Sequence, residues 1–217
     1  MTISEQDYLK AIYEKGGAME LVSNKTISRA LGLSPPSVSE MIKRLSSSGY
    51  IVYEPYKGIR LTDKGIEKAL QVKRRHQLWE LWLTKSLGYP LHMVHEEAER
   101  LEHVMSDELE SRLFEHLGRP SYGAMGERIL TVGAVHEGVV SCPLSDCETS
   151  RSYIITWVED DTELLKYFEN LGLNLGETIK VLGKAPFSGP ITIERDKEKM
   201  VIGYLAARKI HMTSSED

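Results

Sequence analysis

Helix-breaking residues divide the first part of this chain into short elements of fixed order. An amphipathic pattern over residues 4–15 is stopped by two glycines, a second short apolar pattern ends at Gly32, and a third begins after Ser34 with two prolines. Serine is a favoured N-cap, and proline is tolerated in a first helical turn because the N–H it lacks would have no partner there. The pattern predicts three short helices.

A basic β-hairpin is expected directly after the third helix. Gly49 ends that helix, and residues 50–53 have the β-branched and aromatic side chains of a strand. Lys57 and Gly58 form the turn that leads to a returning strand over 59–61. Two short helices around a glycine turn, followed by such a hairpin, indicate a winged helix-turn-helix. A three-helix bundle without a role in DNA binding is the alternative.

Charge favours the DNA-binding interpretation. Residues 1–75 contain thirteen Lys and Arg against eight Asp and Glu, whereas the rest of the chain contains fourteen against 24. Basic and hydroxyl side chains contact phosphates and base edges, proline can touch a thymine methyl, and a glutamate either accepts from a cytosine amino group or points away. The residues expected at the DNA are Lys25, Ser34, Pro35, Pro36, Ser37, Ser39, Glu40, Lys43, Arg44, Lys57 and Arg60.

The acidic middle of the chain carries a pattern of candidate ligands. Residues 64–87 lack proline and predict one long helix, on which His76 and Glu80 are four residues apart and share a face. A second helix is expected over 91–105, with further candidates within about a third of its circumference and beside an apolar stripe. These candidates are His95, Glu99, Glu102 and His103.

These side chains allow three interpretations: a solvated acidic surface, a metal site, or the active site of a metallohydrolase. Exposed acidic stretches are commonly solvated surface. Carboxylates one helical turn apart repel one another, however, and a cation relieves that cost beside an apolar stripe. Two imidazoles on the same face supply further ligands, so the pattern favours a metal site. A metallohydrolase is a third interpretation, but it lacks a positioned base apart from the ligands and leaves the basic hairpin unexplained.

The C-terminal third is expected to form a small β-barrel after a glycine-rich linker. Strands are expected over 152–158, 178–182, 191–193 and 200–204, with a short helix over 162–171. No catalytic constellation accompanies them, and peptide binding is a weaker alternative to a bracing role.

Two features bear on the cellular compartment. The N-terminus has neither a secretory signal nor a long apolar run, which predicts a cytoplasmic protein without a membrane span. Cys142 and Cys147 fit neither the redox spacing with two intervening residues nor a zinc knuckle, so reduced loop thiols are expected and a redox or metal role is the alternative.

Taken together, these motifs resemble the diphtheria-toxin-repressor family of metal-dependent transcriptional regulators, close to its manganese-sensing branch with a C-terminal SH3-like domain. The resemblance runs over nearly the whole chain. It is carried by EQDYLKAIY at 5–13, LSPPSVSEMIKRL at 33–45, LTDKG at 61–65, His76-x-x-x-Glu80, HEEAERLEH at 95–103, GETIKVL at 176–182 and IGYLA at 202–206.

The resemblance implies a mainly α fold with small β elements. Its expected parts are a winged helix-turn-helix DNA-binding domain over 1–72, a helical metal-binding and dimerisation domain over 73–120, a linker over 121–145 and an SH3-like domain over 146–217. Two ions per chain are implied. The first site would be built from Asp7, Glu99, Glu102 and His103, and the second from His76, Glu80 and His95, completed by Asp160 and Glu163.

Two departures from the family limit what is carried over. Residues 121–125 lack the Cys-x-His pair of some manganese-sensing members, which leaves the number of ligands at the second site open. Lys10 stands where some members have a glutamate, so a bridged two-metal site is not expected. Asp7 and Glu99 replace the methionine and cysteine of iron-sensing members. Hard oxygen ligands suit Mn²⁺, so Mn²⁺ is favoured over Fe²⁺.

The function implied is that of a homodimeric repressor without enzymatic activity or a small-molecule substrate. It would bind double-stranded operator DNA when loaded with Mn²⁺ or Fe²⁺ and control genes of metal homeostasis. A winged-helix regulator that ignores metal is the alternative.

Overall fold

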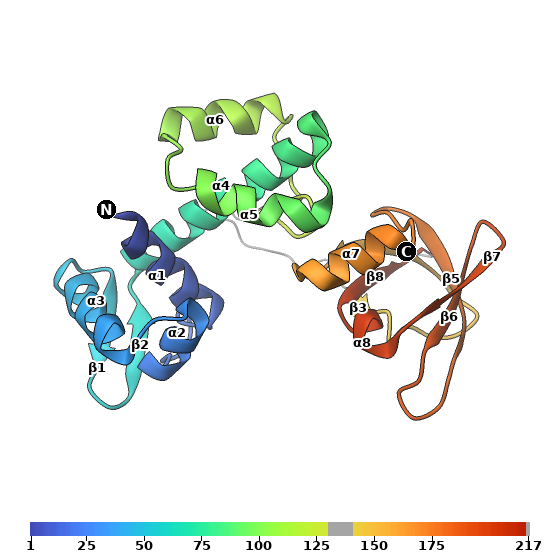
Figure 1. The fold of residues 1–217 in the computed structure, drawn as a ribbon, viewed down its shortest axis with the longest axis horizontal. Coiled ribbons are helices and arrows are strands. Elements are labelled where there is room, and N and C mark those ends of the chain that lie inside the picture. Colours follow the sequence, from blue (N-terminus) through green and yellow to red (C-terminus); the bar gives the residue numbers. More distant parts are fainter. Residues whose placement is uncertain (130–140, 216–217) are drawn as a thin grey trace. The chain divides into compact units, whose positions relative to one another are not determined.

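The computed structural model describes residues 1–129 and 141–215 of this 217-residue chain. Among these residues the chain divides into two compact units. One unit comprises residues 1–79 and 98–113, and the other comprises 80–97, 114–129 and 141–215. Figure 1 shows the order of the elements, and the two units are described separately.

The N-terminal elements are the three helices and the hairpin that the sequence predicts. Helices α1 (Ile3–Glu14), α2 (Asn24–Leu31) and α3 (Pro35–Ser47) precede strands β1 (Ile51–Glu54) and β2 (Gly58–Leu61), which pair antiparallel. Each helix begins at a hydroxyl N-cap, which accepts a backbone hydrogen bond in the first turn. These elements form a winged helix-turn-helix.

The hydrophobic core of this unit fixes the position of α1. Leu9 and Ile12 of α1 are fully buried among side chains of α2, α3 and the hairpin. Gly32 ends α2 with a φ of 65°, a backbone conformation that glycine adopts without steric cost. Because its apolar face is held in this core, α1 presents its other residues in a fixed direction.

Three further helices follow the hairpin, and one of them ends earlier than the sequence predicts. Helix α4 (Asp63–Leu87) is continuous, α5 (Leu91–Leu101) is shorter than the expected 91–105, and α6 is Asp107–His116. Ser106 caps α6 by accepting from Leu109 N at 3.1 Å, so the chain must turn before it. Glu102 and His103 therefore lie in the turn after α5 and not on the expected helical face.

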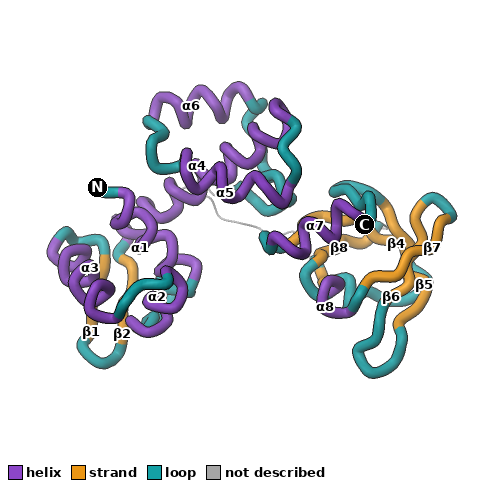
Figure 2. The backbone as a smooth tube through the Cα atoms, in the orientation of Figure 1, coloured by secondary structure: helices purple, strands orange, loops and turns teal. Residues whose placement is uncertain are grey.

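The C-terminal domain is an antiparallel sheet with two short helices, as Figure 2 shows. The strand order is β3-β8-β4-β5-β6-β7, and the elements are β3 (Cys142–Pro143), β4 (Ser152–Val158), α7 (Thr162–Asn170), β5 (Thr178–Lys184), β6 (Ile191–Arg195), β7 (Glu198–Ile202), α8 (Tyr204–Ala207) and β8 (Ile210–Ser214). The four predicted strands are present as β4, β5, β6 and β7. Strands β3 and β8 and helix α8 are additions to the prediction.

Two boundaries in this domain differ from the prediction. Strand β7 begins two residues earlier than expected, because Asp196 and Lys197 adopt φ values of 51° and 71° and close a tight turn without glycine. Strand β3 lies within residues 121–145, the stretch expected to be a linker, and pairs with β8. Residues 130–140 of that stretch lie outside the described residues. The sheet thus begins before residue 146.

The two cysteines lie at the start of this sheet as free thiols. Cys142 is in β3, Cys147 is buried, and their Sγ atoms are 3.4 Å apart. Burial raises the pKa of the Cys147 thiol, so this sulfur is protonated at neutral pH.

In the part of the chain that the structure describes, no helix has the length and apolar character that a membrane span requires.

Candidate metal centre

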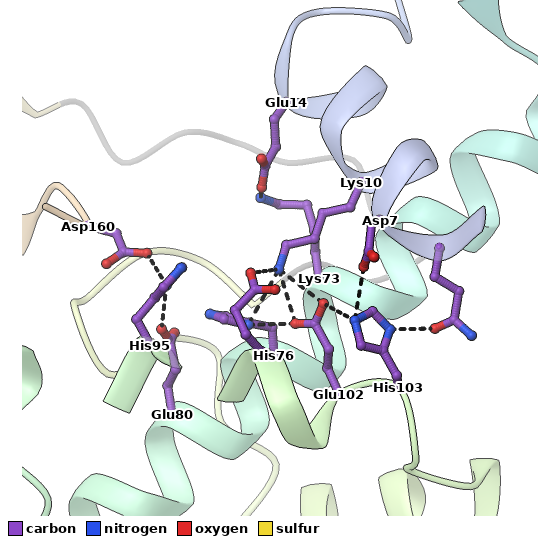
Figure 3. Close-up of polar contacts among 12 residues, drawn as sticks. Asp7, Lys10, Glu14, Lys73, His76, Glu80, His95, Glu102, His103 and Asp160 are labelled. Atoms are coloured by element: carbon purple, nitrogen blue, oxygen red, sulfur yellow. Dashed lines mark hydrogen bonds and ion pairs between the residues drawn. The ribbon is translucent and has the colours of Figure 1, made fainter. Parts of the chain in front are cut away.

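A group of three candidate ligands joins α1 to the turn after α5. His103 Nε2 lies 3.0 Å from Asp7 Oδ1 and 3.5 Å from Glu102 Oε1 (Figure 3). Glu102 is completely buried, and Asp7 is half-buried. One ligand atom from each residue lies within 4.8 Å of the others, so a single cation could contact all three. All three were predicted as ligands of the first site.

Gln6 orients the imidazole of this group. Its Oε1 lies 3.1 Å from His103 Nδ1, so the Nδ1–H donates to the amide oxygen. That bond leaves the Nε2 lone pair directed toward Asp7 and Glu102, which is the arrangement a metal-binding histidine needs. Sequence reasoning missed Gln6, because its contact with His103 spans 97 residues of chain and a buried glutamine beside Asp7 has no local signature.

The ammonium of Lys10 lies inside a second, overlapping group of candidate ligands. Its Nζ lies 2.5 Å from Glu99 Oε1, 3.0 and 3.1 Å from the two Glu102 oxygens, and 3.5 Å from His76 Nδ1 (Figure 3). His76 Nδ1 in turn lies 2.5 Å from Glu102 Oε2. His76 and Glu99, which the prediction assigns to different sites, therefore meet around Lys10.

The electrostatics of these overlapping groups are those of a site short of positive charge. Burial raises the pKa of Asp7, Glu99 and Glu102 raise it further, and His103 and Lys10 oppose this effect. Burial opposes the charged form of Lys10, but attraction to Glu102 and Glu99 outweighs it and holds the pKa of Lys10 above its ordinary value. Lys10 is therefore an ammonium at neutral pH, and the oxygen-rich donor set fits a hard divalent cation.

An open cleft leads to this centre from α1 and α2. Its volume is about 540 Å³, and Asp7, Lys10 and Glu99 are part of its lining. The carboxylates of Asp7 and Glu99 are thus open to solvent from this side, whereas Glu102 is buried behind them.

A second set of candidate ligands lies in the other unit. His95 Nδ1 of α5 is 2.6 Å from Asp160 Oδ2 and 3.6 Å from Glu80 Oε1 of α4 (Figure 3). Hydrogen bonding to Asp160, and then to Glu80, raises the pKa of His95 to about 10 against the effect of burial. Without metal this imidazole holds a proton that a cation must displace.

The other two residues predicted for this second site are His76, which belongs with these three as a candidate ligand, and Glu163, which does not. His76 is one helical turn before Glu80 on α4, and its Nδ1 contacts Glu102. Glu163 is not brought to His95: it lies in the first turn of α7, its side chain is exposed, and it pairs with Lys166 at 2.9 Å. The structure therefore groups Asp160, but not Glu163, with the histidine.

The residues expected at DNA lie on the surface of the winged helix-turn-helix. All of them are exposed except Ser39, which is half-buried and donates to the Pro35 carbonyl at 3.0 Å. Arg44 Nε is 2.8 Å from Glu5 Oε1, and Lys57 Nζ is 2.9 Å from Glu54 Oε2, so both cations have an acidic neighbour.

A hollow connects the start of α2 with the wing. Its volume is about 290 Å³, and Lys25 and Lys57 are part of its lining. Tyr53 and Tyr56 also line it and are exposed, although the prediction does not include them. Tyrosine hydroxyls, like lysine ammonium groups, can donate to the phosphate oxygens of duplex DNA.

Comparison with known proteins assigns each segment of the chain to a family model. Residues 1–59 match "Iron dependent repressor, N-terminal DNA binding domain", 62–131 match "Iron dependent repressor, metal binding and dimerisation domain", and 142–213 match "FeoA domain".

Individual relatives are similar over most of the chain. The diphtheria toxin repressor of Corynebacterium diphtheriae is 34% identical over 200 residues, which are 87% of each protein. A solved structure described as a manganese-dependent transcriptional repressor in complex with manganese is 32% identical, with a TM-score of 0.81 over 97% of this chain and 99% of the other. The structure of ScaR with bound Cd²⁺ is 33% identical, with a TM-score of 0.76 over the same shares.

Proposed function

This chain belongs to the diphtheria-toxin-repressor family of iron- or manganese-dependent transcriptional repressors, and on that premise we propose that it is a Mn²⁺-activated repressor of metal-homeostasis genes. It binds double-stranded operator DNA as a homodimer in the cytoplasm, and Fe²⁺ is the second candidate for the activating ion. The repressor structures with similar folds hold Mn²⁺ and Cd²⁺, which supports a divalent cation as activator.

The observation that carries this proposal is the group of Asp7, Glu102 and His103. Asp7 belongs to α1, which packs in the core of the winged helix-turn-helix, whereas Glu102 and His103 belong to the turn after α5. A bound divalent cation supplies the positive charge that these carboxylates lack. Because the ligands come from both elements, cation binding favours the arrangement of α1 that this structure shows.

The position of α1 matters for DNA binding because α3 packs against the same core. Val38, Ile42 and Leu45 of α3 are fully buried in one cluster with Leu9 and Ile12 of α1. A dimeric helix-turn-helix protein must hold its two recognition helices about 34 Å apart to reach successive major grooves. Fixing α1 therefore limits the positions that α3 can take in each subunit.

The donor chemistry supports Mn²⁺ over softer ions. The first group offers oxygen from Asp7 and Glu102 and one imidazole nitrogen from His103, with no sulfur ligand. Hard oxygen ligands suit Mn²⁺, while intrinsic affinities still rise toward Zn²⁺. We place a second ion at Glu80, His95 and Asp160, with His76 as a further ligand, which makes two ions per chain.

The test is DNA binding as a function of metal. Duplexes are selected from a random pool with the Mn²⁺-loaded protein, and their affinity is then measured by fluorescence anisotropy in Mn²⁺, anaerobic Fe²⁺, Zn²⁺ and EDTA. The proposal predicts tight binding in Mn²⁺ that is lost in EDTA. Binding of equal strength in EDTA would instead identify a metal-independent winged-helix regulator.

A matched pair of variants tests whether the Mn²⁺ requirement for DNA binding depends on the first group of ligands. Asp7→Asn removes one charged oxygen from the first group and should require a higher Mn²⁺ concentration for DNA binding. Asp63→Asn makes the same change at the exposed start of α4 and should leave the Mn²⁺ requirement unchanged. If both variants respond to Mn²⁺ as the parent does, Asp7 is not part of the activating site.

A further inference from the structure

The two cysteines of the chain are in contact in the C-terminal domain, away from the candidate metal ligands. Both are free thiols, and the Sγ atoms of Cys142 and Cys147 are 3.4 Å apart. The sulfurs of a disulfide are about 2.05 Å apart, so bond formation requires an approach of about 1.4 Å. Their sequence spacing matches no redox motif, and it is the fold that brings the two sulfurs together.

A tight turn returns the chain from β3 to the first sulfur. Asp146 N donates to the Pro143 carbonyl at 2.8 Å, which reverses the chain direction after β3. The thiol of Cys147 then lies 3.5 Å from the same carbonyl oxygen and next to Cys142. The sulfur contact is therefore a product of this turn.

The rest of the domain holds this turn in place. The side chain of Leu144 is fully buried, and its N–H donates to the Ile210 carbonyl at 2.8 Å. Lys184 Nζ donates to the Ser145 carbonyl at 2.6 Å from strand β5. Because the turn is anchored to β8 and β5, the two sulfurs stay in contact while the domain is folded.

The two sulfurs differ in accessibility. Cys142 is half-buried, whereas Cys147 is only 1% exposed. Burial raises the pKa of the Cys147 thiol and the Lys184 ammonium opposes this effect less strongly, so Cys147 keeps its proton. Oxidation of a cysteine follows thiolate character and exposure, so an oxidant from solvent reacts first with Cys142.

A metal site is the other use of paired thiols, and the structure favours it less. Among residues 1–129 and 141–215, the groups that bring three or more candidate ligands together include neither cysteine. Structural metal sites need about four ligands, whereas a disulfide needs only the two sulfurs.

We propose that Cys142 and Cys147 form a reversible disulfide when the protein meets a hydroperoxide. The Cys142 thiolate attacks one peroxide oxygen, the O–O bond breaks, and the products are a sulfenic acid on Cys142 and, after uptake of a proton, water or an alcohol. The Cys147 sulfur then attacks the Cys142 sulfur, so that the S–S bond forms and the S–O bond breaks. The hydroxyl leaves with the Cys147 proton as water. A dithiol reverses the reaction by exchange and is itself oxidised.

The test is the mass of the protein after peroxide treatment. Reduced full-length protein in EDTA is treated with hydrogen peroxide, unfolded in denaturant and alkylated with N-ethylmaleimide. The parent should lose the mass of two hydrogen atoms and take up no maleimide, and a tryptic map should show Cys142 linked to Cys147 of the same chain. Dithiothreitol before alkylation should restore two maleimide adducts.

Two variants test the order of the steps, with dimedone present to trap a sulfenic acid. Cys147→Ser lacks the second sulfur and should accumulate a dimedone adduct on Cys142. Cys142→Ser keeps only the buried thiol and should remain unmodified, and an adduct on Cys147 would overturn the assigned roles.

The parent protein alone decides the main point, even if a variant fails to fold. Two maleimide adducts after peroxide treatment, a stable sulfenic acid in the parent, or a disulfide between two chains would each overturn the inference.

Discussion

At the scale of single residues, long-range contacts decide how the ligands behave. The sequence pattern alone predicts that the clustered carboxylates repel one another when no metal is bound. The structure instead places Lys10 between Glu99 and Glu102, 89 and 92 residues away in the chain. No local signal in a helix specifies such a partner. The candidate ligands on the two acidic helices could be predicted from their spacing, whereas Asp7 and Asp160 came only from the resemblance to the family.

Glu102 should therefore stabilise the metal-free protein. Glu102→Gln weakens a buried ion pair with Lys10, so we expect the free energy of unfolding in EDTA to fall by up to about 3 kcal/mol. Glu99→Gln is the matched control and should cost less, because Glu99 is 40% exposed and solvent screens its charge. Chemical denaturation in EDTA measures both, and a Glu102→Gln protein more stable than the parent would contradict the ion pair.

Gln6 should control metal affinity through the imidazole that it orients. Gln6→Ala removes the acceptor for the His103 Nδ1–H, and loss of such a supporting partner typically weakens metal binding by roughly 10 to 100-fold. Gln6→Glu retains an acceptor and should bind Mn²⁺ more tightly than Gln6→Ala does. Isothermal titration with Mn²⁺ compares them, and equal affinities in the parent and Gln6→Ala would rule out this role.

At the scale of elements, the predictions succeed where a cap or glycine marks the boundary. Ser34 and the two prolines after it mark the start of α3, and Gly32 marks the end of α2. Both boundaries were predicted correctly from the sequence. The end of α5 was wrong because Ser106 starts α6 and forces a turn after Leu101. The early start of β7 was missed because Asp196 and Lys197 adopt turn conformations that glycine or asparagine usually marks.

The wing should contribute to DNA binding through charge. Arg60 is exposed on β2, so Arg60→Ala should weaken binding to all duplex sequences. It should also reduce the slope of log affinity against log salt concentration by about one unit for the lost phosphate contact. Arg208→Ala changes another exposed arginine, in the C-terminal domain, and should leave the slope unchanged. A parental slope for Arg60→Ala would show that this residue does not face the backbone.

At the scale of the whole molecule, the order of parts follows from charge and pattern along the chain. The basic winged helix-turn-helix, the acidic helices and the C-terminal sheet were each predictable, since each has its own periodicity and composition. Their joint action was not predictable from local pattern. The contacts of α1 with α5 and with the turn after it connect segments about ninety residues apart, and under the proposed function these contacts couple metal binding to the DNA-binding helices.

The central claim is that one divalent ion and operator DNA favour the same arrangement of α1. Binding equilibria are reciprocal, so the factor by which Mn²⁺ raises operator affinity must equal the factor by which operator raises Mn²⁺ affinity. The direct measurement is the Mn²⁺ dissociation constant of the first site, determined by titration with and without a saturating selected duplex. The account predicts tighter Mn²⁺ binding in the presence of DNA, by the same factor that anisotropy gives for DNA binding with and without Mn²⁺. An Mn²⁺ affinity that DNA leaves unchanged would contradict it.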